Sequence, residues 1–431
     1  MDRTLPERVR QAQTDPCGDG GDPDGMLDVP SWVPFALRFR PPVNSSPEGN
    51  AGHSEMYFNG RLFLRALSLA LFHQPFRIRR WAYVLFFSVL FLAFLGVVAL
   101  GRLIDRLLFP AFKRQPVTKP VFIIAPPRSG TTLTQNLLSL DEDRFLHLKM
   151  YQTIFPAVCF QRAFDLVAWI DARLGRPAER LMGWCEKKWF GGWDDLHKMR
   201  LNQPEEDDAL FLYAFASEAI YMLFPFVKQL WEAGFPDALP PDDRVRLMRY
   251  YRSCLQRHLY ANGPTRTLLS KATQSCGTLD SLNAEFPDAR FITIIRHPYR
   301  SLASHVSLFV PVWQAHSPEI TKDGPVAKEY GQLAIDWYRH LFEFRNRVDP
   351  ARYYCIDYRD LVRNPRETLE KVYAHFGWTI SPQLRERLTA ATERQRDFKS
   401  KHEYTLEEFG MTREGIQAQL GDLLDYYGLE R

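Results

Sequence analysis

The sequence has few cysteines, and none of the six forms a Cys-x-x-Cys pair or lies at metal-ligand spacing from a histidine. The common zinc-site and redox motifs are therefore excluded. We expect reduced, buried thiols, with a lumenal domain carrying disulfides as the alternative. A strong charge of one sign is also lacking, because 55 basic residues face 51 acidic ones. No basic stripe with interleaved aromatic residues is present, so the sequence does not indicate a nucleic-acid partner.

A lysine is missing where a nucleotide-triphosphate loop would need one. Val121–Ile124 is a short apolar run typical of a buried strand, and Ala-Pro-Pro-Arg-Ser-Gly-Thr-Thr follows it at 125–132. The nucleotide-triphosphate motif has glycine and lysine at the positions that Ala125 and Thr131 occupy here. Since that lysine reaches the β- and γ-phosphates, its absence favours a nucleotide that lacks them.

The same loop has the other features of an anion site. A strand, a tight loop and a helix in this order direct backbone N–H groups and the positive end of a helix dipole at one point. Gly130 permits close approach of the backbone, and Arg128 supplies a fixed positive charge. Hydroxyl groups come from Thr131 and Thr132. With Ser129, these residues form the predicted phosphate cradle, and a generic strand-to-helix turn is the alternative.

A second apolar run at 291–295 has a basic residue at its end. Arg296 follows the predicted strand, and a helical pattern from Pro298 carries Ser304. An arginine fork and a hydroxyl group on either side of a strand-to-helix turn can hold a second phosphate. We therefore predict a second phosphate site at Arg296 and Ser304, although an arginine at a strand end is often only a surface charge.

These two segments resemble the motifs of the sulfotransferase superfamily. Pro-Arg-Ser-Gly-Thr-Thr at 127–132 matches the family's 5′-phosphosulfate loop, and Arg296 with Ser304 matches its 3′-phosphate motif at the family's spacing. An arginine in the loop is typical of the branch that includes tyrosylprotein sulfotransferases and many bacterial sulfotransferases. The resemblance extends over about residues 116–409, with supporting motifs at 268–271, 358–361 and 398–410.

The resemblance implies a reaction and further site residues. The donor would be 3′-phosphoadenosine 5′-phosphosulfate (PAPS), with no metal, and the sulfuryl group would pass to a hydroxyl acceptor. Arg128 would contact the leaving phosphate, since preorganised cations stabilise charge that grows in the transition state. Lys271 corresponds to a lysine of related enzymes, and Lys399 and Lys401 would reach the 3′-phosphate. A solvated surface lysine is the alternative for Lys271, and charges on a mobile tail for the other two.

The family's catalytic acid is missing from its usual place. Tyrosylprotein-type relatives have a glutamate shortly after the phosphate-loop helix, where this chain has Lys149 or Gln152. Two substitutes are present: His147, whose neutral imidazole can accept a proton, and Glu206 in the acidic run at 205–208. We predict Glu206 as the base or the substrate-orienting acid. A helix-capping role for the acidic run is the alternative.

The chain before residue 115 divides into three parts. Residues 1–60 are rich in Asp, Gly, Pro and Ser and are predicted to be mostly disordered. Residues 61–80 mix apolar and basic side chains, as an amphipathic interfacial helix does. Residues 81–101 carry no charge and are long enough to span a hydrocarbon core of ~30 Å. We predict a transmembrane or membrane-embedded helix there, with a buried core helix as the alternative.

Strands and helices alternate in the remaining residues, 115–431, which we predict to be the sulfotransferase domain. The alternation favours an α/β fold with a P-loop-like parallel sheet flanked by helices. Arg128, Lys271 and Arg296 follow three of the strands, and open α/β sheets bind ligands at such ends. The predicted strands are at 121–125, 267–270, 291–295 and 353–356, and the long, mostly helical interval 141–262 would shape the acceptor pocket.

Three functions compete on these observations. A membrane-anchored, PAPS-dependent sulfotransferase is the first, with a hydroxyl acceptor that is a lipid or another hydrophobic alcohol. A P-loop-type kinase is the second and is disfavoured by Thr131 at the lysine position. A catalytically silent nucleotide-binding membrane protein is the third, suggested by the missing glutamate. The donor is made in the cytosol, so the catalytic domain would be cytoplasmic in a bacterium and lumenal in the Golgi of a eukaryote.

Overall fold

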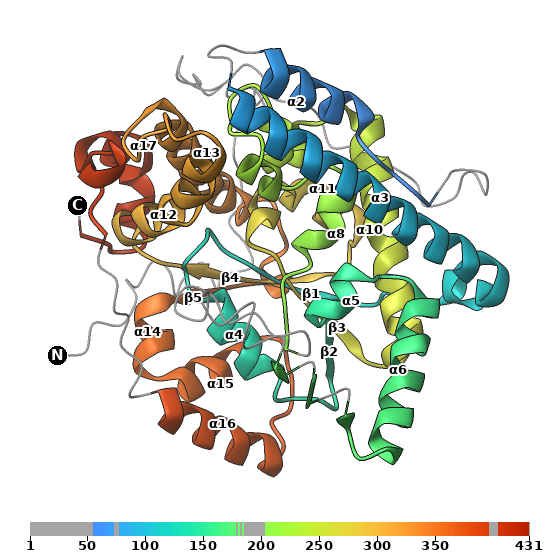
Figure 1. The fold of residues 1–431 in the computed structure, drawn as a ribbon. Helices are drawn as coiled ribbons and strands as arrows, with labels where there is room; N and C mark the ends of the chain where they lie inside the picture. Colours follow the sequence, from blue (N-terminus) through green and yellow to red (C-terminus); the bar gives the residue numbers. More distant parts are fainter. Residues whose placement is uncertain are drawn as a thin grey trace.

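A computed structural model describes residues 55–72, 77–177, 180–181, 183–184, 203–395 and 404–430 of the chain (Figure 1). The predicted donor ligands Lys399 and Lys401 lie outside the described residues, as do residues 1–54. The four cysteines within these ranges are free thiols, as expected: Cys159, Cys254, Cys276 and Cys355.

A five-stranded parallel sheet forms the centre of the molecule, in the order β2-β3-β1-β4-β5. The predicted parallel sheet is confirmed, and four of its strands lie within a residue or so of the predicted ranges. The short strand β2 is the one that the sequence pattern did not reveal, because three residues give no usable period. The strands are β1 Val121–Ile124, β2 Phe145–His147, β3 Thr267–Lys271, β4 Arg290–Ile295 and β5 Tyr353–Asp357.

Helices cover both faces of the sheet, and each face has its own apolar core. Alternate residues of a strand point to opposite faces, so Phe122 and Ile124 of β1 belong to one core and Val121 and Ile123 to the other. The smaller core lies under α4 Thr131–Leu138, α14 Tyr358–Arg363, α15 Pro365–His375 and α16 Pro382–Gln395, below the sheet in Figure 1.

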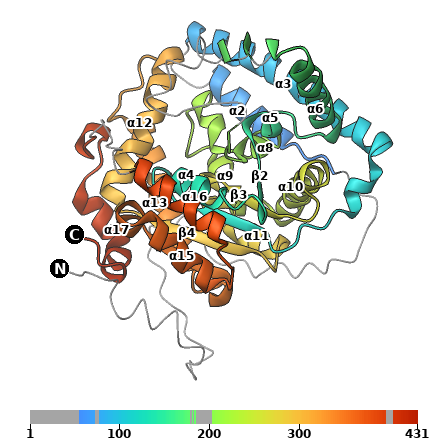
Figure 2. The same cartoon turned by 90° about the horizontal axis from the view of Figure 1, so that it is seen from below.

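The larger core lies on the opposite face and continues into the long connection between β2 and β3. Figure 2 shows these helices around the sheet from below. Helices of this core include α8 Asp208–Tyr213, α9 Trp231–Gly234, α10 Pro241–Asn262, α11 Leu279–Glu285, α12 Pro298–His316, α13 Pro325–Phe344 and α17 Arg413–Tyr426. The connection also holds α5 Met150–Ile154 and α6 Val158–Arg173, which contribute no residue to the core. Short 3-10 helices are η2 Pro110–Arg114, η4 Glu218–Met222, η5 Pro236–Ala238, η6 Thr273–Gly277, η7 Pro350–Arg352 and η8 Glu407–Phe409.

The apolar N-terminal segment forms a long helix, α3 Ile78–Leu108, beside the shorter α2 Gly60–Phe72. Among the described residues, α3 is the one helix that is long and apolar enough to cross a membrane. It extends beyond the predicted range of 81–101 at both ends, because charged residues at each end find partners in the body of the protein. The end of the predicted disordered region is also ordered, since Glu55 forms an ion pair with Arg257 of α10.

Candidate active site

The loop between β1 and α4 has an unusual backbone. Arg128 has φ 65° and Gly130 has φ 92°, both in the left-handed region, and α4 begins directly after Gly130. A Cβ atom on Gly130 would lie 3.1 Å from the ring of Tyr358. Glycine is therefore needed at 130 for its dihedral angle and for its lack of a side chain. The non-glycine residue in a left-handed conformation is typical of a functional loop.

Two arginines meet at this loop. The Arg128 Nε donates a hydrogen bond to Ser304 Oγ at 3.1 Å, and the Arg296 guanidinium donates to the Arg128 carbonyl oxygen. Arg296 also lies over the ring of Tyr358, 4.4 Å from its centroid, and its Nε is buried with no hydrogen-bond partner in the described residues. Loss of water around the guanidinium, and then the charge of Arg296, lower the pKa of Arg128. Two guanidinium groups beside one loop favour the binding of an anion.

Lys271 is the third predicted cation, and its side chain lies beside the same loop. Its side chain at the end of β3 is only 1% exposed, so it is not a solvated surface lysine. Its Nζ lies 3.2 Å from Thr132 Oγ1 on the loop and 3.0 Å from Glu206 Oε1. The fold therefore brings the predicted donor loop and the predicted acid together at one lysine.

The acidic run at 205–208 is held against β3 by its third residue. The Asp207 N–H donates to the Lys271 carbonyl oxygen at 3.2 Å. The Asp207 carboxylate accepts hydrogen bonds from Tyr251 Oη and, at 2.8 Å, from Ser270 Oγ. Burial raises its pKa to about 6. Asp207 stands at the N-cap of α8, yet its side chain makes no capping hydrogen bond. Its carboxylate instead attaches the acidic run to β3 and α10, contacts that the sequence did not reveal.

A family model described as "Sulfotransferase family" matches residues 120–382, which is more than half of the chain. The chain belongs to the sulfotransferase family. The match begins at β1 and includes the two-arginine loop, Lys271, Glu206 and Ser304.

Named relatives agree with this assignment. The omega-hydroxy-beta-dihydromenaquinone-9 sulfotransferase Stf3 of Mycobacterium tuberculosis is 26% identical over 321 residues, covering 72% of this chain and 76% of the relative. Its counterpart in Mycobacterium bovis gives the same values. Among solved structures, sulfotransferase STF1 of Mycobacterium tuberculosis has a TM-score of 0.62 at 22% identity, covering 84% of this chain and 92% of that one. STF9 of Mycobacterium avium has a TM-score of 0.60 at 20% identity, covering 75% and 80%. The two structures show the fold.

This sulfotransferase has a second buried acid near the loop, Glu218 at the start of η4. The Tyr330 hydroxyl donates to its Oε2 at 3.1 Å, and His305 Nε2 lies 3.8 Å from the same oxygen. Burial raises the pKa of Glu218 to about 8, and burial followed by the charge of Arg128 lowers the pKa of His305 to about 3. Both shifts favour the neutral forms of the two side chains. Nothing in the sequence around Glu218 distinguished it from other acids.

The other predicted proton acceptor lies elsewhere on the sheet. His147 ends β2 and pairs in register with Leu269, and burial lowers its pKa to about 4. In the described part of the chain its Nδ1 has no hydrogen-bond partner. Gln152, one of the two residues predicted to stand where relatives have a glutamate, accepts a hydrogen bond from the N–H of the other, Lys149, at 2.9 Å and so caps α5. Its side chain is occupied by this local contact.

Proposed function

We propose that this sulfotransferase uses PAPS as its donor and transfers the sulfuryl group to a hydroxyl acceptor. The observation that carries the proposal is the contact between Arg128 and Arg296 at the carboxyl end of the sheet. Neither arginine forms an ion pair with any residue that the structure describes. The positive charge of Arg296 is close enough to lower the pKa of Arg128, so this arrangement favours a bound polyanion.

The residues present fit a nucleotide that carries phosphates at both the 5′ and the 3′ positions of its ribose. We assign Arg128, Ser129, Gly130, Thr131 and Thr132 to the 5′-phosphosulfate, since α4 begins there and its first N–H groups face the loop. Arg296 and Ser304 are assigned to the 3′-phosphate, and Lys399 and Lys401 stay predictions for the same group. PAPS supplies an activated sulfuryl group when it is bound.

Lys271 and Glu206 are proposed to act on the transferring group and the acceptor. Lys271 donates to Thr132 beside the donor loop, so its charge can stabilise the oxygens that become negative. The carboxylate of Glu206, 3.0 Å from Lys271 Nζ, would orient the acceptor hydroxyl and take its proton. His147 stays the second candidate for the base.

A thermal-shift panel tests the donor. Adenosine 3′,5′-bisphosphate should raise the melting temperature of the full chain, because a ligand that binds only the native state stabilises it. ATP with Mg²⁺ should not, since the loop has Thr131 in place of the P-loop lysine. The reverse result would favour the kinase. Turnover with radiolabelled PAPS then separates an active enzyme from a silent nucleotide-binding protein.

We also propose a hydrophobic, membrane-resident acceptor. The relative Stf3 is named for a hydroxylated menaquinone, which is a lipid. An apolar cavity of about 340 Å³ lies between α3, η4 and α12, a size suited to a small ligand. Two of its wall residues come from segments near the proposed site, since Ala219 follows Glu218 in η4 and Leu212 lies in α8, which begins within the acidic run. The remaining walls are mainly aromatic: Phe63, Tyr83, Phe87, Phe91, Phe215 and Phe224.

Filling the cavity tests the acceptor proposal. Ala219→Phe and Ala315→Phe put bulk into the cavity and should weaken binding of radiolabelled dodecanol. Binding of adenosine 3′,5′-bisphosphate should stay unchanged. Ala374→Phe, at an exposed position on α15, is the matched control. Equal dodecanol binding by wild type and filled variants, or none by wild type, would contradict the cavity assignment and leave the donor assignment intact.

A further inference from the structure

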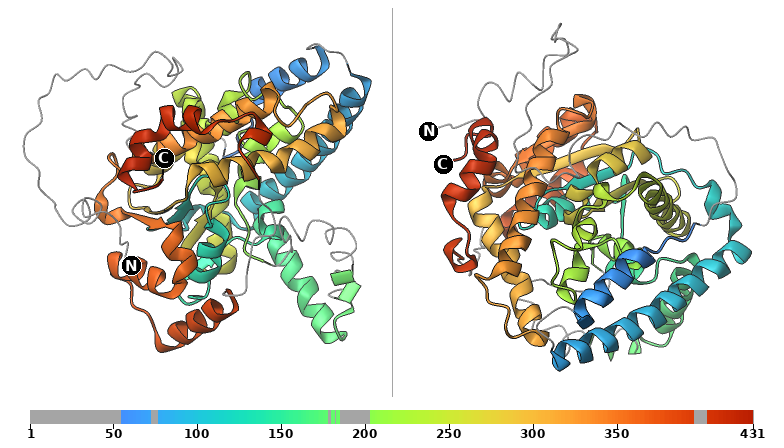
Figure 3. Two further views of the ribbon diagram at one scale, coloured as in Figure 1. Left: turned by 90° about the vertical axis from the view of Figure 1, so that its left-hand side faces the viewer. Right: turned by 90° about the horizontal axis from the view of Figure 1, so that it is seen from above.

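Helix α3 lies against the catalytic domain along its whole length. Its fully buried residues recur along one narrow stripe, and nearly all other positions are exposed or partly exposed. Figure 3 shows the helix running along one edge of the body, beside α2. The stripe consists of Arg80, Val84, Ser88, Val98, Gly101, Arg102 and Asp105. A helix buried on one stripe is typical of a helix packed on a surface.

The start of α3 is fastened by a buried arginine. Arg80 is 5% exposed, and its Nε donates to Ser317 Oγ at 2.8 Å. Its second nitrogen forms an ion pair with Glu319. Ser317 and Glu319 directly follow α12, the helix that carries Ser304 of the proposed donor site. The first turn of α3 is therefore attached to the catalytic domain.

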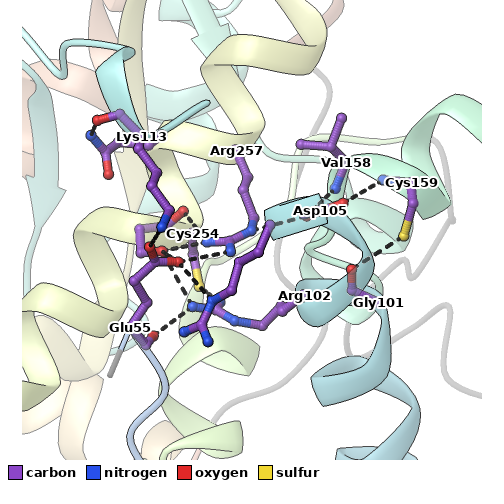
Figure 4. Close-up of polar contacts among 12 residues, drawn as sticks. Glu55, Gly101, Arg102, Asp105, Lys113, Val158, Cys159, Cys254 and Arg257 are labelled. Atoms are coloured by element: carbon purple, nitrogen blue, oxygen red, sulfur yellow. Dashed lines mark hydrogen bonds and ion pairs between the residues drawn. The ribbon is translucent and has the colours of Figure 1, made fainter. Parts of the chain in front are cut away.

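The end of α3 is fastened to the same domain by a buried polar cluster (Figure 4). Arg102 donates to Cys254 Sγ at 2.8 Å and to the Glu55 carbonyl oxygen at 2.7 Å. Asp105 is fully buried and accepts a hydrogen bond from Arg257 Nε at 2.9 Å. Cys254 and Arg257 belong to α10. Both ends of α3 are thus bound to the catalytic domain.

Asp105 also fixes α6 to α3. Its two carboxylate oxygens accept the N–H groups of Val158 at 2.8 Å and Cys159 at 2.9 Å, at the start of α6. From this cap α6 projects away from the body (Figure 3, left). Its exposed side chains include Phe164, Leu166, Val167, Trp169 and Ile170. An apolar helix that projects into water would be unfavourable, so this surface requires an apolar neighbour.

These contacts exclude a simple crossing of the bilayer. Arg80 and Arg102 are about 33 Å apart along the axis, which exceeds a hydrocarbon core of ~30 Å. A spanning helix would place them on opposite sides of the membrane, whereas both are bound to one domain. We infer that α3 lies in the plane of the membrane surface. Its exposed face and that of α6 enter the lipid, and the whole catalytic domain stays on one side.

The composition of this surface fits a lipid partner of anionic character. The exposed face of α3 presents large apolar residues throughout: Leu85, Phe86, Val89, Leu90, Val97, Leu100, Leu103 and Leu107. Exposed arginines accompany it, with Arg61 on α2, Arg79 at the start of α3 and Arg173 at the end of α6. Apolar residues beside arginines are typical of helices that lie in the headgroup region of anionic membranes.

Label counting in vesicles tests the inference. The inference rests on the proposed membrane attachment and not on the donor assignment. Donor binding is therefore measured separately, as a check that each variant is folded. Arg79→Cys and Leu108→Cys are introduced together, with Cys17, Cys159, Cys185 and Cys355 changed to Ser. The full chain is reconstituted into sealed phosphatidylcholine–phosphatidylglycerol vesicles and treated with a membrane-impermeant maleimide. Mass spectrometry then counts the labels on each molecule.

The label count distinguishes the two arrangements whatever the orientation of each molecule. An in-plane helix gives molecules with both labels or neither, because the two ends lie on the same side. A spanning helix gives molecules with a single label and would overturn the inference. Val89→Cys should be protected in vesicles if α3 is in lipid, and its full labelling there would also overturn the inference.

Vesicle flotation supplies a second measurement. Val89→Glu should lower the partition coefficient of the full chain by about tenfold or more, because a charge on the lipid face is costly. Val362→Glu is the matched control, since Val362 is exposed to a similar degree on α14, away from α3 (Figure 1). Equal binding by the two variants, or a stable dimer that does not float with vesicles, would overturn the inference.

Discussion

Arginines cluster at two places in this sulfotransferase. Within the described residues, one cluster is paired with acidic side chains and the other is not. At the proposed donor end of the sheet, the Arg296 guanidinium donates to the Arg128 carbonyl oxygen, and the described residues form no ion pair with either arginine. At the end of α3, Arg257 is fully buried and forms ion pairs with Asp105 and Glu55. A neutralised arginine cluster holds a structure together, whereas an arginine cluster without acids indicates a missing anion. The following variants test this contrast.

The largest effect should come from the neutralised cluster. Asp105→Ala leaves Arg257 buried without its short ion pair and removes the acceptor of two N–H groups of α6. The free energy of unfolding should fall by about 3–5 kcal/mol, the usual cost of breaking a buried pair. Urea denaturation in detergent measures it. Asp422→Ala, which breaks an exposed pair with Arg339, should cost at most about 1 kcal/mol and is the control.

The donor cluster should respond in activity and not in stability. Arg128→Ala should reduce turnover with radiolabelled PAPS by about 10²–10³, because one preorganised contact to the transition state is lost. The free energy of unfolding should stay the same or rise, since a repulsion with Arg296 disappears. Arg300→Ala, at an exposed position on α12, is the control. Near-normal turnover by the Arg128 variant would contradict the donor assignment.

A smaller effect is expected at the second phosphate site. Arg296→Ala or Ser304→Ala should weaken binding of adenosine 3′,5′-bisphosphate by about 1.5–3 kcal/mol, the value of a charge-assisted hydrogen bond. Adenosine 5′-monophosphate, which lacks the 3′-phosphate, should lose much less. Calorimetric titration of both ligands makes the comparison. If both lose affinity equally, the two residues support the loop and do not contact the 3′-phosphate.

The last effect develops gradually with pH and concerns an acid outside both clusters. Burial raises the pKa of Glu218 from 4.5 to about 8, so between these values the native state keeps a proton that the unfolded chain loses. Its contribution to stability therefore falls as pH rises, by at most about 1.4 kcal/mol per pH unit. Glu218→Gln removes this dependence. Its stability relative to wild type should increase between about pH 5 and pH 7. A constant difference would mean that Glu218 is ionised in the native state.

The predicted residues of the donor site came together in the fold to different degrees. The sequence indicated Arg128, Lys271, Arg296 and Ser304, and the structure joins Arg128 to Ser304 and Lys271 to Thr132. It also indicated Glu206, but not Asp207, which holds that acid against β3. Asp207 was missed because its partners, Ser270 and Tyr251, are far from it in the sequence.

Helix α3 shows the same limit on a larger scale. Its apolar composition predicted a transmembrane or membrane-embedded helix, and the apolar exposed face agrees with contact to lipid. The partners of Arg80, Arg102 and Asp105 lie far along the chain, on segments after α12 and within α10. No local pattern reveals that both ends of the helix are attached to one domain.

The sequence by itself determined the features that depend on neighbouring residues. A buried strand, a glycine-containing loop and a following helix form the proposed phosphate cradle within a dozen residues, because backbone dihedral angles and helix dipoles are local properties. Only the tertiary structure decided which charges are neutralised. Asp105 reaches Arg257 and Lys271 reaches Glu206 through packing of distant segments. Arg128 and Arg296 are held together by neighbouring parallel strands, with no acid between them in the described residues. Sequence spacing does not encode such long-range contacts, because they form only when the cores on both faces of the sheet assemble.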